Sequence, residues 1–388
     1  MPRVKCPKCS KEETVLKAGF IRGLQRYFCK ECDYHFTLFK KKSLPPVVPR
    51  KSHQTTIIDI AKAIGISVST VSRALKDHPD ISEKTKLAVK KIAAEMEYQP
   101  NVIAQSLSSR ETHTLGVVIP DIENPFFASV LSGIQQVASS SGYKVMICQS
   151  NESHKTEVEN VQALIANWVD GLLICHSKET TSFEHIKLQL KKGIPIVHFD
   201  RVCPEVDTPK VLVDDINGAT AITSHLIAQG CHRIGVIAGP RHLIITKRRL
   251  LGYQKALEAH QLPYVQSLIA HTDFTKKSIH NALHLMLEDK RPDAIFCISD
   301  SSAIHTMMYL KNLGIKIPDD IAIAGLGNEY LGEIIEPPLT SYDLRSVKVG
   351  ETAASLFFER LINERDPDSV TIPGSLIVRS SSLKKKTE

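Results

Sequence analysis

Short apolar runs alternate with amphipathic stretches from Leu115 almost to the C-terminus. This alternation predicts parallel sheets whose two faces are covered by helices. The expected strands are Leu115–Ile119, Lys144–Cys148, Gly171–Ile174, Ile196–Phe199, Ile234–Ala238, Ala294–Ile298 and Ile321–Gly325. The expected helices include Pro125–Ser140, Gly218–Gln229 and Lys247–His260. The segment 112–388 is longer than a single doubly wound sheet needs. We therefore expect two lobes with a ligand cleft at the carboxyl ends of the strands.

Motifs of nucleotide-binding and hydrolytic enzymes do not follow these strands. The sequence holds no G-x-G-x-x-G or G-x-x-x-x-G-K-[ST] after any of them, and no G-x-S-x-G or H-E-x-x-H. The pattern therefore predicts a binding domain and not an enzyme.

Charge is divided unevenly along the chain. Residues 1–110 hold 21 Lys and Arg against 10 Asp and Glu, whereas the remainder holds 28 against 32. A basic segment with regularly spaced apolar residues indicates a folded module that binds a polyanion, and not a solvated tail. No apolar run approaches the ~20 residues of a membrane span, and the basic N-terminus lacks the apolar core of a secretory signal. We therefore expect a cytoplasmic protein.

Two C-x-x-C pairs near the N-terminus, Cys6/Cys9 and Cys29/Cys32, predict a zinc site. Four thiolates can surround Zn²⁺ at ~2.3 Å, and so short a segment needs a metal because it cannot bury enough apolar surface alone. A redox role would explain one pair but not two, and His35 is expected to stay outside the complete ligand set. The remaining cysteines, each alone in an apolar segment, are expected to be reduced core thiols: Cys148, Cys175, Cys203, Cys231 and Cys297.

Residues 1–43 are therefore expected to form a small zinc ribbon. The CPKC motif, the internal Gln25-Arg26-Tyr27 and the second C-x-x-C resemble the ribbon that begins many insertion-sequence transposases. The resemblance implies DNA contact, although ribbons also dock proteins. A transposase-like enzyme would need an acidic metal triad in a catalytic core. The sensor motifs described below occupy the part of the chain where that core would have to lie. Residues 44–53 predict a basic, proline-stiffened linker.

Residues 54–100 predict an all-α helix-turn-helix unit. Thr56 is a candidate N-cap, Gly65 marks the turn, Ser67 would cap the second helix and Val71 would anchor it. A third helix, Ser82–Met96, would pack against both. Short polar side chains and one Arg at the start of the second helix suit major-groove recognition, whereas an ordinary helical hairpin is the alternative. The expected DNA-binding residues of this unit are Thr56, Ser67, Val68, Ser69, Thr70, Ser72 and Arg73.

The motif T-I-x-D-I-A…G-I-S-x-S-T-V-S-R-A-L over residues 56–75 resembles the headpiece of the lactose-repressor/galactose-repressor (LacI/GalR) family. The following Tyr98-x-Pro-Asn101-x-x-Ala104-x-x-Leu107 extends the resemblance. It implies that residues 101–111 are a hinge that becomes helical on the operator, with Asn101, Ala104 and Leu107 at the DNA. Leu107 would wedge into a base step of the minor groove together with its counterpart in a second subunit. The residues alone predict only a linker here.

Residues 112–388 resemble the periplasmic-binding-protein type I sensor domain of the same family. The resemblance is carried by the motifs N-P-F-F (124–127), G-P…R-L-L-G-Y (239–253) and A-I-F-C-I-S-D (294–300). It implies an N-lobe of about 112–214 and 338–365, and a C-lobe of about 215–337 and the tail.

The resemblance also implies an effector site between the lobes. Phe126 and Phe127 would stack on an apolar sugar face, and Phe274 would close the other face. The polar effector-binding residues, which would hydrogen-bond hydroxyl groups, are Asn124, Asp200, Arg201, Arg249 and Asp300.

Several positions depart from the family pattern. Gly325-Leu-Gly-Asn328 lacks a familiar carboxylate, Ser299 replaces a common Asn, and Leu243 and Ile245 fill positions that are often polar. These departures predict an effector that is smaller than a common hexose, less polar or otherwise different.

Together the patterns predict a ligand-responsive transcriptional repressor that binds a palindromic operator as a homodimer, with a tetramer left open. The effector would be a small molecule, by resemblance a sugar, and zinc the only cofactor. A solute-binding protein of the same sensor fold is the alternative. The basic headpiece and the absence of a signal peptide argue against it.

Overall fold

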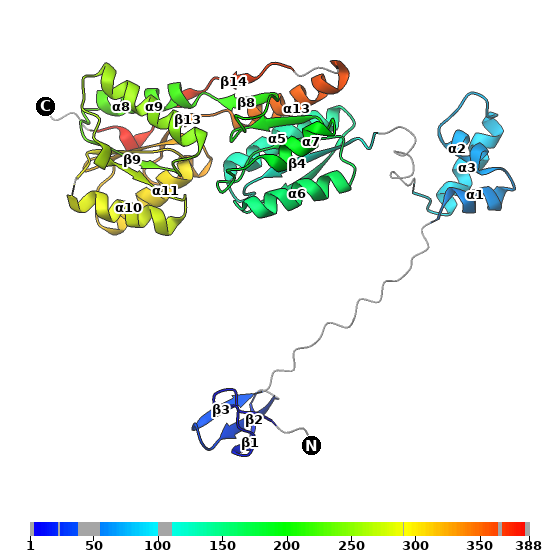
Figure 1. Ribbon diagram of the computed structural model, residues 1–388, viewed down its shortest axis with the longest axis horizontal. Helices are drawn as coiled ribbons and strands as arrows, with labels where there is room; N and C mark the ends of the chain where they lie inside the picture. The colour runs from blue at the N-terminus through cyan, green and yellow to red at the C-terminus, as the bar shows by residue number, and fades with distance from the viewer. Residues whose placement is uncertain are drawn as a thin grey trace. The chain divides into compact units, whose positions relative to one another are not determined.

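The computed structural model describes residues 4–21, 24–37, 55–99, 111–289, 291–363 and 367–384 (Figure 1). The chain divides into two units, residues 1–100 and 101–388, and each is described by itself. The predicted linker and the predicted hinge residues Asn101, Ala104 and Leu107 lie outside the described residues.

Residues 4–37 form a three-stranded antiparallel sheet with the order β1-β2-β3. The strands are β1 (Val15–Ile21), β2 (Leu24–Cys29) and β3 (Tyr34–Thr37). The core of this sheet is very small, since Cys6, Cys29 and Phe36 are the buried residues of its hydrophobic cluster. So little apolar burial agrees with a fold that depends on a cross-link between its cysteines.

Three helices form the second small fold: α1 (Ile57–Ile64), α2 (Val68–Leu75) and α3 (Glu83–Glu95). Thr56 and Asp59 make a reciprocal capping box at the start of α1. Gly65 ends α1 with a φ of 73°, a left-handed conformation that glycine adopts without steric cost, and this glycine redirects the chain into α2. Ile60, Val71 and Val89, one from each helix, are fully buried. The predicted helix-turn-helix unit is confirmed.

Residues 111–384 form two lobes, each built on a six-stranded sheet. All strand pairs of the N-lobe sheet are parallel, and in the C-lobe sheet all are parallel except β13–β15. The N-lobe sheet has the order β14-β8-β7-β6-β4-β5, and the C-lobe sheet has the order β10-β9-β11-β12-β13-β15. The N-lobe strands are β4 (Thr114–Ile119), β5 (Lys144–Gln149), β6 (Gly171–Ile174), β7 (Ile196–Phe199), β8 (Lys210–Val213) and β14 (Val370–Ile372). The C-lobe strands are β9 (Ile234–Ala238), β10 (Ile269–His271), β11 (Ala294–Cys297), β12 (Ala322–Gly327), β13 (Thr340–Asp343) and β15 (Ser375–Ile377).

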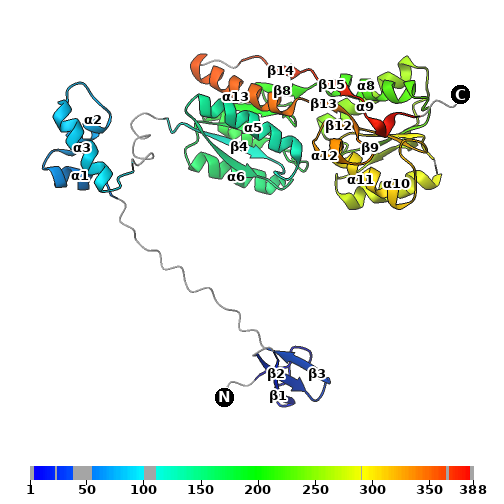
Figure 2. The ribbon, with the colours of Figure 1, turned by 180° about the vertical axis from the view of Figure 1, so that it is seen from behind.

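Helices cover both faces of each sheet, as the alternating sequence pattern predicts. Figures 1 and 2 show α8 and α9 on one face of the C-lobe sheet and α10 and α11 on the other. The N-lobe helices are α5 (Pro125–Ser140), α6 (His154–Ala166), α7 (Glu184–Lys191) and α13 (Ser346–Asn363). The C-lobe helices are α8 (Asp215–Ala228), α9 (Ile244–Ala259), α10 (Lys276–Asp289), α11 (Asp300–Asn312) and the short α12 (Leu331–Ile334), with 3₁₀ turns at Gln266–Leu268 and Ser380–Ser382.

The lobe boundaries differ from the prediction near the C-terminus. β13 pairs with β12 in the C-lobe sheet, so the chain returns to the N-lobe only after Asp343 and not at residue 338. β14 pairs with β8, so Val370–Ile372 also belongs to the N-lobe, beyond the predicted limit of 365. Each of these strands has only three or four residues, and such short apolar runs do not specify which sheet they join. Over the ranges described above, no helix is both long and apolar enough to cross a membrane.

Candidate DNA-binding surface and effector cleft

The N-terminus of α2 presents a cluster of hydroxyl groups. The Ser67 side chain accepts a hydrogen bond from the Thr70 backbone N–H (3.1 Å) and lies 2.8 Å from the hydroxyls of Ser69 and Thr70. Ser67 therefore acts first as the cap of α2. A hydroxyl-rich helix N-terminus also carries partial positive charge, which favours the phosphates of a nucleic acid.

The exposed face of α2 agrees with the predicted recognition surface. Val68, Ser69 and Arg73 are exposed, and Thr70 and Ser72 are half-buried. Val71 and Ala74 face inward and are fully buried. Thr56 caps α1 and lies outside this face.

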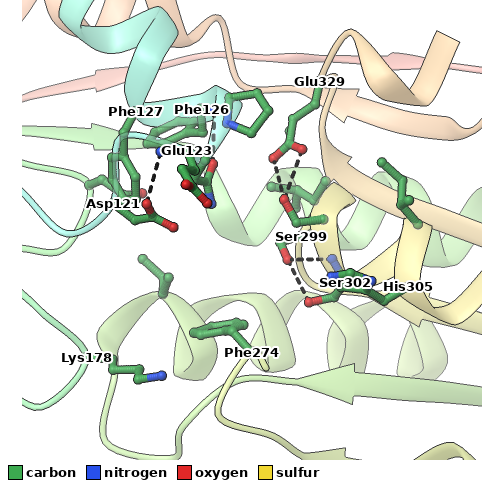
Figure 3. Close-up of a pocket in the computed structure, with 18 of the residues that line it drawn as sticks. Asp121, Glu123, Phe126, Phe127, Lys178, Phe274, Ser299, Ser302, His305 and Glu329 are labelled. Atoms are coloured by element: carbon green, nitrogen blue, oxygen red, sulfur yellow. Dashed lines mark hydrogen bonds between the residues drawn. The ribbon is translucent and has the colours of Figure 1, made fainter. Parts of the chain in front are cut away.

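A cavity of about 450 Å³ lies between the two lobes at the carboxyl ends of their parallel strands. Its size falls in the range typical of small-molecule sites. Seven of the eight predicted effector-binding residues line it: Asn124, Phe126, Phe127, Asp200, Arg201, Arg249 and Phe274. Figure 3 shows Phe126, Phe127, Phe274 and Glu329 arranged around this common space.

The aromatic residues of the cleft are fixed by their local backbone. Asn124 caps α5 by accepting a hydrogen bond from the Phe126 N–H (3.0 Å), and this cap holds Phe126 and Phe127 at the cleft. Phe274 has a φ of 67°, which is strained for a bulky side chain and is the kind of strain that collects at binding sites. A Cβ at Gly239 would lie 2.2 Å from the Phe274 ring, so only glycine there leaves room for the ring.

Arg201 lies between aromatic residues of the two lobes. Its guanidinium carbon is 5.7 Å from the ring centroids of both Phe127 and Phe274, within the range of cation–π attraction. The sequence predicted that these rings cover the two faces of a sugar. In the structure they also contact the guanidinium of Arg201. Glu152 binds the same guanidinium through oxygens at 2.7 and 2.9 Å.

Arg249 is also held by a carboxylate. Its Nε donates to Asp215 at 2.7 Å, and both side chains are buried. Burial raises the pKa of Asp215 to about 6, and the nearby Arg249 opposes this rise. Burial likewise raises the pKa of Asp200, opposed by Arg249 and Arg201.

The structure does not bring Asp300 into the cleft. Its carboxylate is fully buried and accepts hydrogen bonds from the Ser341 hydroxyl (2.7 Å) and the Glu329 N–H (2.9 Å). A Cβ at Gly325 would lie 2.2 Å from an Asp300 oxygen, so the close approach of β12 also holds this side chain. Burial raises the pKa of Asp300 to about 6. In this arrangement Asp300 orders the ends of β12 and β13 and is not among the residues that line the cleft.

Glu329 is a cleft residue that the sequence interpretation missed. Its buried carboxylate lines the cleft and accepts hydrogen bonds from the Ser301 hydroxyl at 3.1 and 3.3 Å. Burial, with added repulsion from Asp300, raises the pKa of Glu329 to about 7. Glu329 directly follows the segment Gly325-Leu-Gly-Asn328, in which this chain lacks a carboxylate of the family pattern. The carboxylate directly after this segment is the sequence signal that marks it.

Other missed residues hold the edges of the cleft. Lys178 reaches from the N-lobe to the C-lobe, where its ammonium donates to the Asp273 backbone carbonyl at 2.8 Å. The Lys178 N–H donates to Glu152 at 2.6 Å, so one carboxylate holds both this loop and Arg201. Charged side chains in loops carry no periodic signal, and nothing in the sequence pattern singles them out.

The four N-terminal cysteines converge at one point. Their sulfur atoms lie within 4.8 Å of one another, with separations of 3.8 Å (Cys6–Cys32), 3.7 Å (Cys9–Cys29) and 3.6 Å (Cys29–Cys32). Tetrahedral Zn²⁺ with bonds of ~2.3 Å requires sulfur separations of about 3.8 Å, and the four thiols fit this geometry. His35 contributes no ligand atom to the group, and its ring packs 4.6 Å from that of Phe28.

A helix-turn-helix unit joined in one chain to a two-lobed sensor with a cleft defines a ligand-responsive DNA-binding protein. Residues 56–101 match the bacterial regulatory proteins of the lacI family, and residues 112–385 match the periplasmic binding proteins and sugar binding domain of the LacI family. The chain belongs to the LacI family of transcriptional regulators. Neither match includes the ribbon, since the matched residues begin at 56.

Individual relatives agree with this assignment over most of the chain. The transcriptional regulator DegA of Bacillus subtilis is 31% identical over 331 residues, which cover 85% of this chain and 98% of DegA. The transcriptional repressor CytR of Escherichia coli is 30% identical over 329 residues, covering 84% and 96%. The structure of the transcriptional regulator CelR in complex with cellobiose superimposes with a TM-score of 0.65 at 28% identity, covering 84% and 99%. The chain is therefore a ligand-responsive, DNA-binding transcriptional regulator, and the expectation that it is not an enzyme is confirmed by its relatives.

Proposed function

We propose that this regulator is a cytoplasmic repressor that binds a pseudo-palindromic operator as a homodimer under the control of a sugar. The observation that carries the proposal is the cleft, which combines aromatic rings with ion-paired polar side chains from both lobes. Such a combination suits a polyhydroxylated ligand with apolar faces. CytR is a repressor and CelR has been solved with cellobiose, and both relatives support this assignment.

Dimerisation follows from the recognition unit. One copy of α2 can contact only one half-site, and two copies about one helical turn apart are needed to recognise a palindrome. The hinge expected over residues 101–111 would order when both headpieces occupy the operator, with Leu107 at the minor groove.

Control by the effector requires that the effector binds one arrangement of the lobes more tightly than the other. Lys178 crosses from one lobe to the other in the arrangement described, and we expect this contact to break when the lobes separate. An effector that binds the closed form more tightly shifts DNA affinity by the difference in its affinity for the two forms, typically about 1–3 kcal/mol.

We propose further that the ribbon binds one zinc ion through Cys6, Cys9, Cys29 and Cys32 and adds phosphate contacts to the headpiece. The support is the sulfur geometry and the small core of the sheet. Metal analysis of the full-length protein is expected to find one zinc per chain, which Cys9→Ser with Cys32→Ser would remove. Cys148→Ser, outside the cluster, serves as the control and would keep the zinc. An unchanged metal content in the double variant would refute the site.

The function is tested by selecting DNA with the purified protein and measuring fluorescence anisotropy with and without a panel of sugars. A pseudo-palindromic site whose affinity shifts with one sugar is the expected result. A selected site that no sugar affects would overturn the sugar assignment and leave the regulator in place. If no site is selected, the repressor proposal fails.

A further inference from the structure

The basic side chains that line the cleft already have oxygen partners. Arg201 pairs with Glu152, Arg249 pairs with Asp215, and the Lys178 ammonium binds a backbone carbonyl. His305 also lines the cleft, and burial together with the nearby Lys276 lowers its pKa, which favours its neutral form. Within the described residues, each of these cations has at least one oxygen partner, and the Arg201 Nε is the one buried donor among them that makes no hydrogen bond.

Carboxylates outnumber cations in the same lining. Three basic side chains face six acidic ones: Asp121, Glu123, Glu152, Asp200, Asp273 and Glu329. Among the residues that the structure describes, neither Asp200 nor Glu329 has a basic side chain at ion-pair distance. A buried carboxylate without a cation is costly, and the cost falls when a ligand brings a positive charge.

The two unpaired carboxylates differ in their electrostatic surroundings. Asp200 lies in the field of Arg201 and Arg249, which favour its charged form. The charged neighbour of Glu329 is Asp300, a second carboxylate, and its direct partner is the neutral Ser301. Of these two residues, Glu329 is therefore the one whose carboxylate would be stabilised more by a bound cation.

We infer that the cleft binds a sugar that carries a protonated amine, and that Glu329 pairs with this amine. The inference rests on the proposed function, because it specifies the chemistry of the effector. The same excess of carboxylates disfavours acidic sugars and sugar phosphates. The aromatic rings of the cleft already accommodate one cation, since Arg201 lies against Phe127 and Phe274.

The pH dependence of the affinity distinguishes the binding of an amino sugar from the binding of a neutral sugar. The pKa of Glu329 is raised to about 7, and an ammonium ion favours the carboxylate form. Affinity for an amino sugar is therefore expected to rise as the pH increases from about 6 to about 7.5, with release of a proton from Glu329. A neutral sugar that accepted a hydrogen bond from protonated Glu329 would show the opposite slope.

The experiment is isothermal titration calorimetry of the full-length protein with matched sets of sugars. Each set contains a hexosamine, its parent hexose and the corresponding hexuronic acid, in the gluco, galacto and manno configurations. We expect one hexosamine to bind at least about tenfold more tightly than its parent hexose, and the acids not to bind. Glu329→Gln is expected to abolish this preference for the hexosamine over its parent hexose. Glu258→Gln, an exposed carboxylate on α9, is the matched control and is expected to keep the preference.

Three results would overturn the inference. They are tighter binding of a parent hexose or a hexuronic acid than of the hexosamine, no binding of any of the sugars, or an affinity for the hexosamine that falls with rising pH. Operator binding measured on the same preparation separates this failure from that of the proposed function. Intact operator binding that responds to a neutral sugar rejects the amine and keeps the regulator. Loss of operator binding itself rejects the proposed function.

Discussion

Arg73 is an exposed cation on the face of α2 that is expected to contact bases. Its planar guanidinium can bind a guanine edge bidentately, and such a contact is typically worth about 1–3 kcal/mol. Arg73→Ala is therefore expected to weaken operator binding by about 5- to 150-fold and to relax base preference at one position of each half-site. Fluorescence anisotropy on the selected operator and its single-base variants measures both effects. Lys84→Ala, an exposed cation on α3, is the control, and an equal loss in both variants would argue against base recognition by Arg73.

The ionisation of Glu329 in the cleft also affects the stability of the sensor domain. Its folded-state pKa of about 7 lies above the ordinary value of 4.5, so its contribution to stability is complete below pH 4.5 and is lost as the pH rises through 7. Glu329→Gln stays neutral and avoids this loss. Relative to the variant, the wild type is expected to lose about 2–3 kcal/mol between pH 4.5 and 7.5, as measured by urea unfolding of the sensor domain. Parallel pH profiles for the two proteins would contradict the raised pKa.

The loop over residues 176–180 depends on helix α6 for its position. Glu157 on α6 is fully buried and accepts hydrogen bonds from His176 (2.8 Å), His185 (2.9 Å), the Ser177 N–H (2.6 Å) and the Thr180 hydroxyl (2.8 Å). Burial opposes ionisation, but the hydrogen bonds from His176 and His185 hold the pKa of Glu157 well below its usual range. The carboxylate therefore fixes the loop that carries Lys178 to the other lobe.

Glu157→Gln replaces one acceptor oxygen by an amide that faces hydrogen-bond donors. The variant is expected to lose about 2–4 kcal/mol of stability, because buried donors lose their partner. Its effector affinity is expected to fall as well, since the loop would no longer be fixed at the cleft. Chemical denaturation and calorimetry measure the two effects, with the exposed Glu159→Gln on the same helix as the control. Equal stability of the two variants would show that the network does not hold the loop.

At the scale of the whole molecule, the regulator combines a family core with an additional three-stranded sheet over residues 4–37, which we propose to be a zinc ribbon. If the ribbon binds phosphates, removal of its zinc by a chelator is expected to weaken operator binding and to lower the salt dependence by about one unit for each phosphate that the ribbon no longer neutralises. The thermal unfolding of the sensor domain should not change, because the proposed zinc lies outside it. Anisotropy over a salt series, before and after chelation, measures the effect. An unchanged salt slope after the loss of zinc would show that this segment makes no phosphate contacts.

The sequence by itself determined the elements with strong local patterns. Thr56, Gly65 and Ser67 marked the ends of α1 and α2 because caps and left-handed turns need particular residue types at single positions. Seven of the parallel strands were equally clear, since continuous apolar runs between amphipathic helices have few alternative structures. The short parallel strands β8, β10, β13 and β14 were not predicted. The aromatic residues of the cleft were found through motifs of the family.

Only the tertiary structure decided which groups meet. Gly133 and Gly350 lie far apart in the sequence, yet a Cβ at either would lie about 2 Å from a backbone oxygen of the opposite helix, Val347 or Val130, where α5 and α13 pack together. The sheet that β13 and β14 join depends on partners and not on their own few residues. Glu329 entered the cleft and Asp300 did not, although both follow strands, because a carboxylate's role depends on burial and on neighbours from other elements. Charge pairing of this kind is set by distances in space, which local sequence periodicity does not encode.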